Sequence, residues 1–115
     1  MSTDCVFCGI RDKKIPADIV FEDDQMIAFK DITPQAPEHL LIIPKKHIRS
    51  FNDLSDDDAV MLGKTFVKIK DIARGLSISE SGYRIVVNCN GDAGQEVFHL
   101  HVHLLGGRKF TWPPG

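Results

Sequence analysis

The chain has 115 residues, of which 43% are hydrophobic and 26% are charged, and its formal net charge is −2. This size and composition fit one globular domain over residues 1–115. A pI of about 6.2 argues against a nucleic-acid partner, because such proteins carry a basic surface. No apolar run approaches the roughly 20 residues of a membrane span and the N-terminus lacks a signal-peptide core, so we expect a cytoplasmic protein without membrane contact.

The first part of the chain alternates short apolar runs with turn signals. These runs predict a short N-terminal helix, a β-hairpin and one further strand. The further strand is apolar throughout and ends at a proline, so we expect both of its faces to be covered. The predicted elements are a helix over 6–11, strands over 19–21, 26–29 and 40–43, and a proline-containing loop over 31–37.

One strong helix is predicted from Ser55 to about Gly75. Ser55 is a suitable N-cap, and with Asp58 it resembles a capping box that has a shorter acid than usual. Gly75 suits a C-terminal cap. Apolar residues at spacings of three and four predict a stripe that packs on the core. The stripe comprises Ala59, Leu62, Phe66, Ile69, Ala73 and Leu76.

Two more strands are predicted, one over 83–88 and one that contains three histidines, with a polar turn over 90–94 between them. The element order is thus three strands, the long helix and two strands, preceded by the short helix. We therefore expect an α+β fold with a five-stranded, mostly antiparallel sheet, one long helix and a short N-terminal helix.

The segment 98–105 places His99, His101 and His103 at alternate positions between branched apolar residues. Alternate residues of a strand share a face, so three imidazoles should line one side. Neighbouring rings would start about 7 Å apart on a straight strand, whereas zinc–nitrogen bonds are ~2.0–2.1 Å. One metal centre built from all three is therefore disfavoured, and nucleophilic work by the central histidine is favoured.

A glycine-containing loop, 91–95, directly precedes the histidines. Glycines let backbone N–H groups approach an oxyanion closely, so the loop reads as a small phosphate cradle beside the histidines. Asn88, on the preceding strand, is placed to act as an uncharged donor at the same site.

Cys5 and Cys8 form a lone C-x-x-C pair in a chain with three cysteines. An odd count in an intracellular protein does not indicate a disulfide framework. From the residues alone, the pair fits a redox couple, half of a zinc site, or no function.

The run His99-Leu100-His101-Val102-His103-Leu104 resembles the signature of the histidine-triad superfamily of nucleotide hydrolases and transferases, and the chain is most similar to its Hint branch, the histidine-triad nucleotide-binding proteins. The similarity covers nearly the whole chain. It includes the segments 15–17, 21–24, 31–37, 43–48, 94–95 and 105–108 and the ending Trp112-Pro113-Pro114-Gly115.

This resemblance implies a hydrolase of purine nucleoside 5′-phosphoramidates, of the adenosine 5′-monophosphoramidate type, without a catalytic metal. His101 would attack the α-phosphorus to give a nucleotidyl-histidine, which water then hydrolyses. His103 would contact the phosphate, and His39 would support the nucleophile. The residues implied in substrate binding are Asn88, Gly94, Gln95, Asp31, Ile32, Phe7, Ile10, Phe29 and Trp112.

Two groups of these residues also have an alternative structural interpretation. Phe7, Ile10, Phe29 and Ile32 resemble an apolar slot around a purine, but on sequence alone they are more simply explained as core residues. Trp112 resembles a tail residue that reaches the partner's site in a homodimer, and the alternative is a flexible aromatic terminus.

The family resemblance also bears on the cysteines and on Glu96. Some histidine-triad proteins bind structural zinc through positions that match Cys5, Cys8, His47 and His99. Glu96 stands where many Hint members have a serine that helps the leaving nitrogen depart. A carboxyl group there would act as a proton donor if its pKa were raised, whereas an ionised carboxylate would repel the phosphate. The rival functions are a dinucleoside polyphosphate hydrolase and a nucleotide-binding adaptor with incidental hydrolysis.

Overall fold

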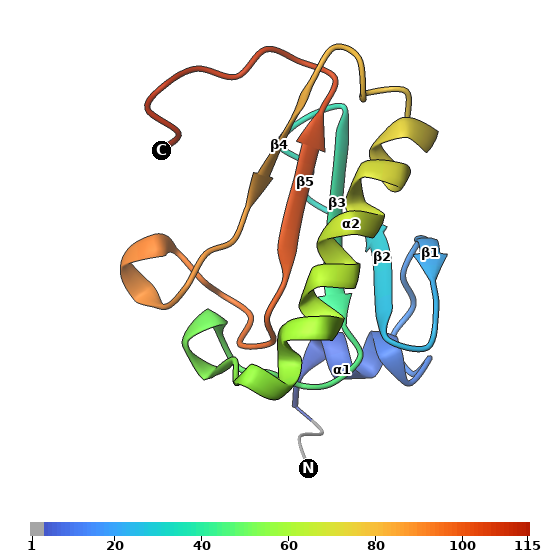
Figure 1. The fold of residues 1–115 in the computed structure, drawn as a ribbon, viewed down its shortest axis with the longest axis vertical. Coiled ribbons are helices and arrows are strands. Elements are labelled where there is room, and N and C mark those ends of the chain that lie inside the picture. The colour runs from blue at the N-terminus through green and yellow to red at the C-terminus, as the bar shows by residue number, and fades with distance from the viewer. Residues whose placement is uncertain (1–3) are drawn as a thin grey trace.

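The computed structural model describes residues 4–115, so the first three residues of the predicted domain lie outside it (Figure 1). Five strands form one sheet in the order β1-β2-β3-β5-β4, and each neighbouring pair is antiparallel. The predicted α+β class is confirmed. The elements are α1 (Val6–Arg11), β1 (Ile19–Glu22), β2 (Met26–Lys30), β3 (Glu38–Pro44), α2 (Ala59–Gly75), β4 (Tyr83–Val86) and β5 (Val102–Gly106).

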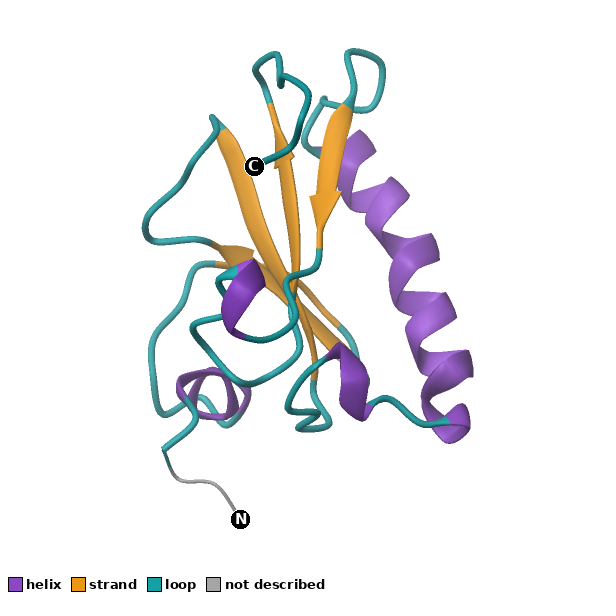
Figure 2. Ribbon diagram, turned by 90° about the vertical axis from the view of Figure 1, so that its left-hand side faces the viewer, coloured by secondary structure: helices purple, strands orange, loops and turns teal. Residues whose placement is uncertain are grey.

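The two faces of the sheet bury different apolar clusters. Helix α2 lies along one face, and α1 lies on the opposite side (Figure 2). Under α2, the residues Ile69, Ile72 and Ala73 pack against side chains of β2, β3 and β5. On the other face, Phe7 and Ile10 of α1 pack against β2 and β3. Strand β3 contributes to both clusters, as expected for a strand covered on both faces.

The long helix differs in two details from its prediction. The capping box of Ser55 and Asp58 is present, but it starts a 3₁₀ turn over Asp56–Asp58 that leads into α2 at Ala59. The predicted stripe is wrong at Ala59 and Phe66, which are exposed. The buried stripe instead includes Thr65, the residue before Phe66. The hydroxyl of Thr65 donates to the Met61 carbonyl. No described helix has the length and apolar character that crossing a membrane requires.

The histidine segment is only partly a strand. Strand β5 begins at Val102, whereas residues 97–99 form a bend, so the prediction of a strand from Phe98 is wrong for its first half. Strand β4 likewise ends at Val86, opposite His103, two residues before its predicted end. Leu100 is nevertheless buried, as are Val102 and Leu104, and the latter two belong to the cluster under α2.

Candidate functional site

A pocket of about 550 Å³ opens on the α1 side of the sheet, and we call it the histidine pocket. A larger groove of about 690 Å³, between α2 and the β1–β2 turn, contains no histidine. The histidine pocket crosses the sheet from the end of β2 to the segment after β4. Its lining includes Phe7, Ile10, Phe29, Asp31, Ile32, His39, Asn88, Gly94, Glu96, His101 and His103. The pocket therefore brings together most of the predicted catalytic and substrate-binding residues.

His101 is held in one tautomer by the backbone. Its Nδ1 lies 2.8 Å from the carbonyl oxygen of His99. A carbonyl only accepts, so Nδ1 carries the proton and Nε2 keeps its lone pair. The ring is almost fully buried and packs edge-on against Phe7, with centroids 5.1 Å apart. This leaves Nε2 as a nucleophilic or basic atom in a fixed orientation.

His39 and His103 form a hydrogen-bonded pair beside His101. The backbone N–H of Gln35 donates to His39 Nδ1 at 3.0 Å, so Nε2 of the neutral ring bears the proton. That Nε2 lies 2.9 Å from His103 Nδ1, which must accept. His103 Nε2–H is then the donor available to a bound molecule. The ring of His103 lies 5.1 Å from that of His101, between centroids.

Burial keeps both of these imidazoles neutral. Desolvation lowers the pKa of His39, and the nearby carboxylate of Asp31 opposes this effect only in part. Desolvation, followed by repulsion from His101 and His39, lowers the pKa of His103 to about 4. A neutral His103 donates through one nitrogen and accepts through the other, as the hydrogen-bond pattern requires.

A second cluster joins Cys5, Cys8, His47 and His99. The distances are 3.4 Å from Cys5 Sγ to His99 Nδ1, 3.2 Å from Cys8 Sγ to His47 Nδ1, and 3.2 Å between the two Nδ1 atoms. Zinc bond lengths imply roughly 3.3–3.8 Å between the ligand atoms of a tetrahedral site. The four donor atoms therefore fit such an ion with little movement.

The protonation of this cluster also suits a metal. His99 Nε2 lies 2.8 Å from the Pro44 carbonyl and so carries the proton, which leaves the Nδ1 lone pair facing the cysteines. Burial lowers the pKa of His99 to about 4, so the ring is neutral. Burial, and then the neighbouring Cys5, raise the pKa of the Cys8 thiol. A bound cation opposes that shift by stabilising the thiolate.

Asp31, His39 and His103 also offer donor atoms close together, but they do not fit a metal. Binding through His39 Nε2 would move its proton to Nδ1, which faces the Gln35 N–H. Two donors would then oppose each other without an acceptor. The contacts of this group instead match a hydrogen-bond relay, with Asp31 Oδ2 3.4 Å from His39 Nε2.

Comparison with known proteins identifies the family to which this sequence and fold belong. The model of the HIT domain matches residues 12–110, which is most of the chain. The chain belongs to the HIT family. An uncharacterized HIT-like protein of Synechocystis is 47% identical over 115 residues, covering all of both chains. A HIT family hydrolase of Legionella pneumophila shares 55% identity with a TM-score of 0.95, covering 97% of this chain and 100% of the other. A histidine triad protein of Clostridium difficile shares 41% identity with a TM-score of 0.92, over 96% of each chain.

The structure also gives the positions of Ile32, Gln95 and Trp112 in this HIT chain. Ile32 is 97% exposed, so it lies at the rim of the histidine pocket and not in a core. Gln95 does not line the pocket, because its buried side chain binds Asn90 N, Arg49 O and Val97 O. Trp112 is 82% exposed and does not line the pocket of its own chain, so its predicted contact with a partner's site stays a prediction.

Other pocket residues of the HIT domain were not singled out from the sequence. Leu41 lines the pocket two residues after His39, and strand alternation places both on one face. Lys30 and Val97 also line it, but neither has a sequence signal that distinguishes it from surface or core residues. Gln35 and Pro44 orient His39 and His99 through a backbone N–H and a backbone carbonyl, so no side-chain pattern in the sequence predicts these contacts.

Proposed function

We propose that this HIT protein is a Hint-type hydrolase of purine nucleoside 5′-phosphoramidates that works through a covalent nucleotidyl-histidine on His101. The observation that carries the proposal is the tautomer of His101. Its Nδ1–H is held by the His99 carbonyl, which leaves an Nε2 lone pair beside the His103 donor. The hydrolase and histidine-triad relatives of similar fold support the reaction class.

The lining residues of the pocket follow one another across the sheet in an order that suits the base, ribose and phosphate of this substrate. Phe7, Ile10 and Phe29 form its apolar part, which suits a purine face. Asp31 follows β2 at the same end, and a carboxylate accepts both ribose hydroxyls side by side. One oxygen already accepts the Thr33 N–H at 2.8 Å, which fixes the side chain while leaving further lone pairs. The α-phosphate would then lie over the histidines of β3 and β5.

The chemistry would proceed in two displacements. His101 Nε2 forms a bond to phosphorus, and the phosphorus–nitrogen bond breaks with its electron pair going to the amine, which takes up a proton. His103 Nε2–H and Asn88 donate to phosphoryl oxygens as charge develops. Water then attacks phosphorus, the bond to His101 breaks, and a proton is released. The products are a nucleoside monophosphate and an amine.

The four-residue cluster would hold zinc in this protein, with Cys5 and Cys8 from the start of α1, His47 from the segment after β3, and His99. When bound, zinc supplies a structural cross-link and takes no part in the displacements. The cluster lies on the α1 side of His99, and the catalytic histidine lies two residues further along the chain. No catalytic metal is required, because a neutral imidazole provides the nucleophile directly.

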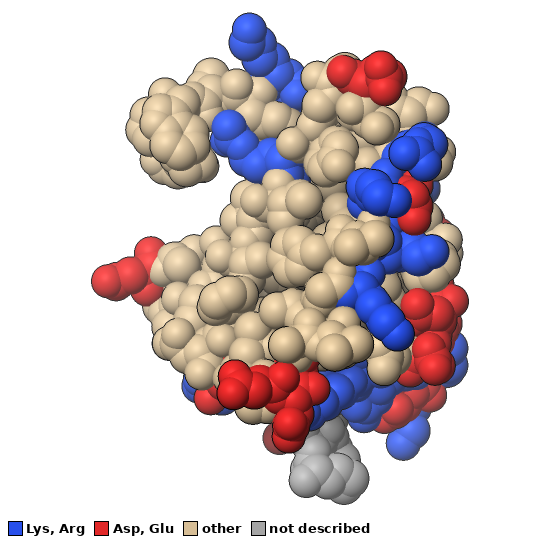
Figure 3. Space-filling model, viewed as in Figure 1, with Lys and Arg blue, Asp and Glu red and all other residues tan. Residues whose placement is uncertain are grey.

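We also propose a homodimer. Strand β4 is the last strand in the sheet order, so one edge of its backbone has no partner strand in the described chain. Phe66 on α2 and Ile85 on β4 are exposed. The face of the molecule on which Figure 1 shows α2, β5 and β4 carries few charges near its centre (Figure 3). Pairing this edge and face with a second copy would cover both. Sedimentation of the wild type should give a dimer, and Ile85→Asp should shift it towards monomer.

Single-turnover hydrolysis of an adenosine 5′-phosphoramidate tests the enzymatic proposal. Wild type should release the amine and form an adenylylated protein that intact-mass measurement detects on rapid quenching. His101→Asn, whose amide can occupy the place of Nδ1 but which has no nucleophilic nitrogen at the place of Nε2, should lose both signals. Equal rates in the two proteins would overturn the proposal and favour a nucleotide-binding adaptor.

A further inference from the structure

We propose that Glu96 makes the histidine pocket select phosphoramidates whose amine portion carries an additional positively charged group. The inference rests on the proposed function and adds a substrate class to it. It concerns the leaving side of the pocket, which the purine and ribose contacts do not define.

The sheet order separates the two ends of the pocket. Asp31 follows β2, and His39 and His103 lie on the neighbouring strands β3 and β5. Asn88 and Glu96 come from the connection between β4 and β5, on the far side of the histidines from Asp31. A nucleotide that places its ribose at Asp31 and its phosphorus at His101 therefore directs the remaining substituents of phosphorus towards Asn88 and Glu96.

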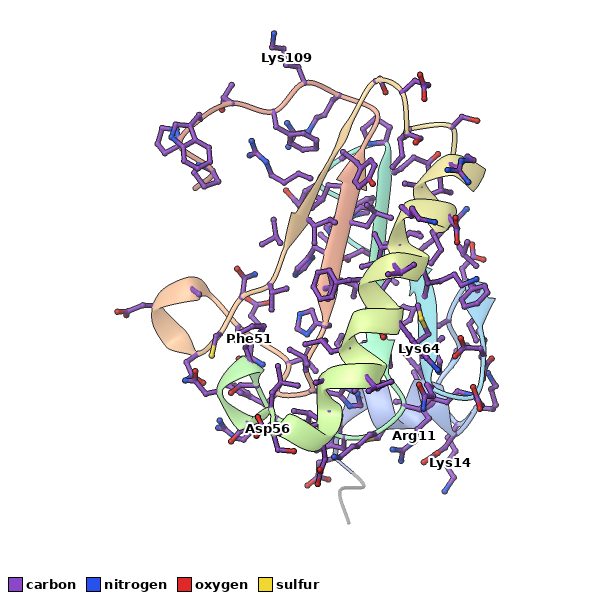
Figure 4. All side chains as sticks on the ribbon, in the orientation of Figure 1. Arg11, Lys14, Phe51, Asp56, Lys64 and Lys109 are labelled. Carbon is purple, nitrogen blue, oxygen red and sulfur yellow. The ribbon has the colours of Figure 1, made fainter. Side chains whose placement is uncertain are left out.

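The charges that line the pocket are mostly negative. Among the described residues 4–115, the pocket is lined by two carboxylates, those of Asp31 and Glu96, and by one Lys or Arg, which is Lys30. Lys30 is the last residue of β2, and its ammonium group lies 3.6 Å from the carboxylate of Asp18. The lysines labelled in Figure 4, which are Lys14 after α1, Lys64 on α2 and Lys109 near the C-terminus, lie away from the β4–β5 connection. The Glu96 carboxylate is exposed and makes no ion pair within residues 4–115.

The backbone on which Glu96 stands is firmly held. The side chain of the preceding Gln95 accepts from Asn90 N at 2.8 Å and donates to Arg49 O at 3.0 Å and Val97 O at 3.1 Å. The N–H of Gly94 donates to Gly91 O at 3.0 Å, and Gly94 adopts φ +82°, which favours glycine. The backbone therefore holds Glu96 at the rim of the pocket, and its exposed carboxylate moves only within the reach of the side chain.

A carboxylate at this position acts differently on different amines. It repels the anionic phosphoryl group of every substrate, so the phosphate alone does not discriminate among them. A cationic group on the amine portion is attracted to Glu96, whereas an anionic group adds a second repulsion. For one charge pair at a solvent-exposed rim, we expect roughly a three- to tenfold effect on kcat/KM.

Three adenosine 5′-phosphoramidates of equal chain length test this inference. Their amines are 1,4-diaminobutane, butylamine and 4-aminobutanoate, which carry a positive, a neutral and a negative end group. For wild type, kcat/KM should fall in that order at low ionic strength, and the differences should shrink with added salt. Glu96→Gln should bring the three values together, and Glu96→Lys should reverse their order.

Asp92→Asn is the matched control, because Asp92 is an exposed acid in the same connection that does not line the pocket. It should keep the wild-type order. Similar values for all three substrates in wild type, or an order unchanged in Glu96→Lys, would overturn the inference while the proposed hydrolysis stands. Failure of wild type to cleave any of the three would overturn the proposed function as well.

Discussion

The Nδ1 atom of His101 lies 2.8 Å from the carbonyl oxygen of His99, and the ring of His99 itself points into the Cys5–Cys8–His47 cluster. One residue thus uses its backbone to orient the proposed nucleophile and its side chain to complete the candidate metal site. The two roles are chemically independent, because the carbonyl belongs to the main chain. They are joined mechanically, because displacement of the His99 backbone would change the direction of the His101 hydrogen bond.

The two roles should therefore separate by mutation. We expect Cys5→Ser/Cys8→Ser to lose the metal and to melt at a lower temperature, because the cross-link between α1 and His99 disappears. We expect His101→Asn to keep about one metal per chain and to lose activity by at least about 10³-fold, since it removes the nucleophile. Elemental analysis, thermal unfolding and turnover are measured on the same preparations.

Two results would contradict this separation. Retention of zinc by the double cysteine variant would exclude the four-residue ligand set. A loss of turnover in that variant as large as in His101→Asn would mean that the metal takes part in the chemistry.

The hydrogen bond from His39 to His103 should fix the tautomer of His103, and a variant that keeps a donor at position 39 should preserve this effect. His39→Leu removes the donor to His103 Nδ1, so His103 is free to take the other tautomer and no longer presents Nε2–H to the phosphate. We expect kcat to fall roughly 10- to 100-fold, less than for outright deletion of a donor. His39→Gln, whose Nε2 amide can still donate, should recover most of this loss.

The nitrogen chemical shifts of His103 report its tautomer, which a packing defect alone would not change. The wild type and His39→Gln should show the Nε2–H tautomer, whereas His39→Leu should show a mixture. An unchanged tautomer in His39→Leu would mean that other contacts set it and that the relay is not functional.

The buried neutral imidazoles predict a loss of stability in acid. Burial lowers the pKa of His39 and lowers that of His103 to about 4, whereas histidine in an unfolded chain titrates near about 6.5. As the pH falls from about 6.5 to about 4, the unfolded state takes up protons that the folded state excludes, so the free energy of unfolding decreases. Urea unfolding across this range should show a shallower decrease for His103→Asn than for wild type. Parallel curves would show that His103 does not contribute.

Much of the fold was readable from periodicity. The hairpin, the strand covered on both faces and the Ser55–Asp58 capping box each follow from local residue types, and the structure has them all. Phe66 was misplaced because its position falls at the edge of the packed stripe, and a helical period of 3.6 does not say which edge is covered. The bend at 97–99 was missed because the apolar alternation continues through it.

The parts of the candidate site that depend on side-chain chemistry could be predicted from the sequence. The histidines and the two cysteines carry their own signal, and the structure brings them into two neighbouring clusters. The tautomers could not be predicted, because they depend on the carbonyls of His99 and Pro44 and the N–H of Gln35. These groups exist in every residue, and only the fold decides which of them faces a ring.

Gly106 on β5 gives a prediction about packing beneath the sheet. A Cβ atom built there would lie 2.6 Å from Cδ1 and 3.0 Å from Cβ of Ile78, which is buried. Gly106→Ala should therefore lower the free energy of unfolding by about 1–3 kcal/mol through overpacking. Gly63→Ala is the control, because nothing lies within 4 Å of its Cβ position. That change replaces glycine within α2 and should raise stability by about 0.5–1 kcal/mol.

A double-mutant cycle assigns the Gly106 effect to its cause. Ile78→Val removes Cδ1, the atom nearest to the new methyl group, and alone should cost about 0.5–1.5 kcal/mol. Because it relieves the closest contact, Gly106→Ala/Ile78→Val should be less destabilised than the sum of the single variants by at least about 0.5 kcal/mol. Chemical denaturation of the four proteins measures this coupling. Additive costs would mean that the glycine is required for the backbone of β5 and not for the space that Ile78 occupies.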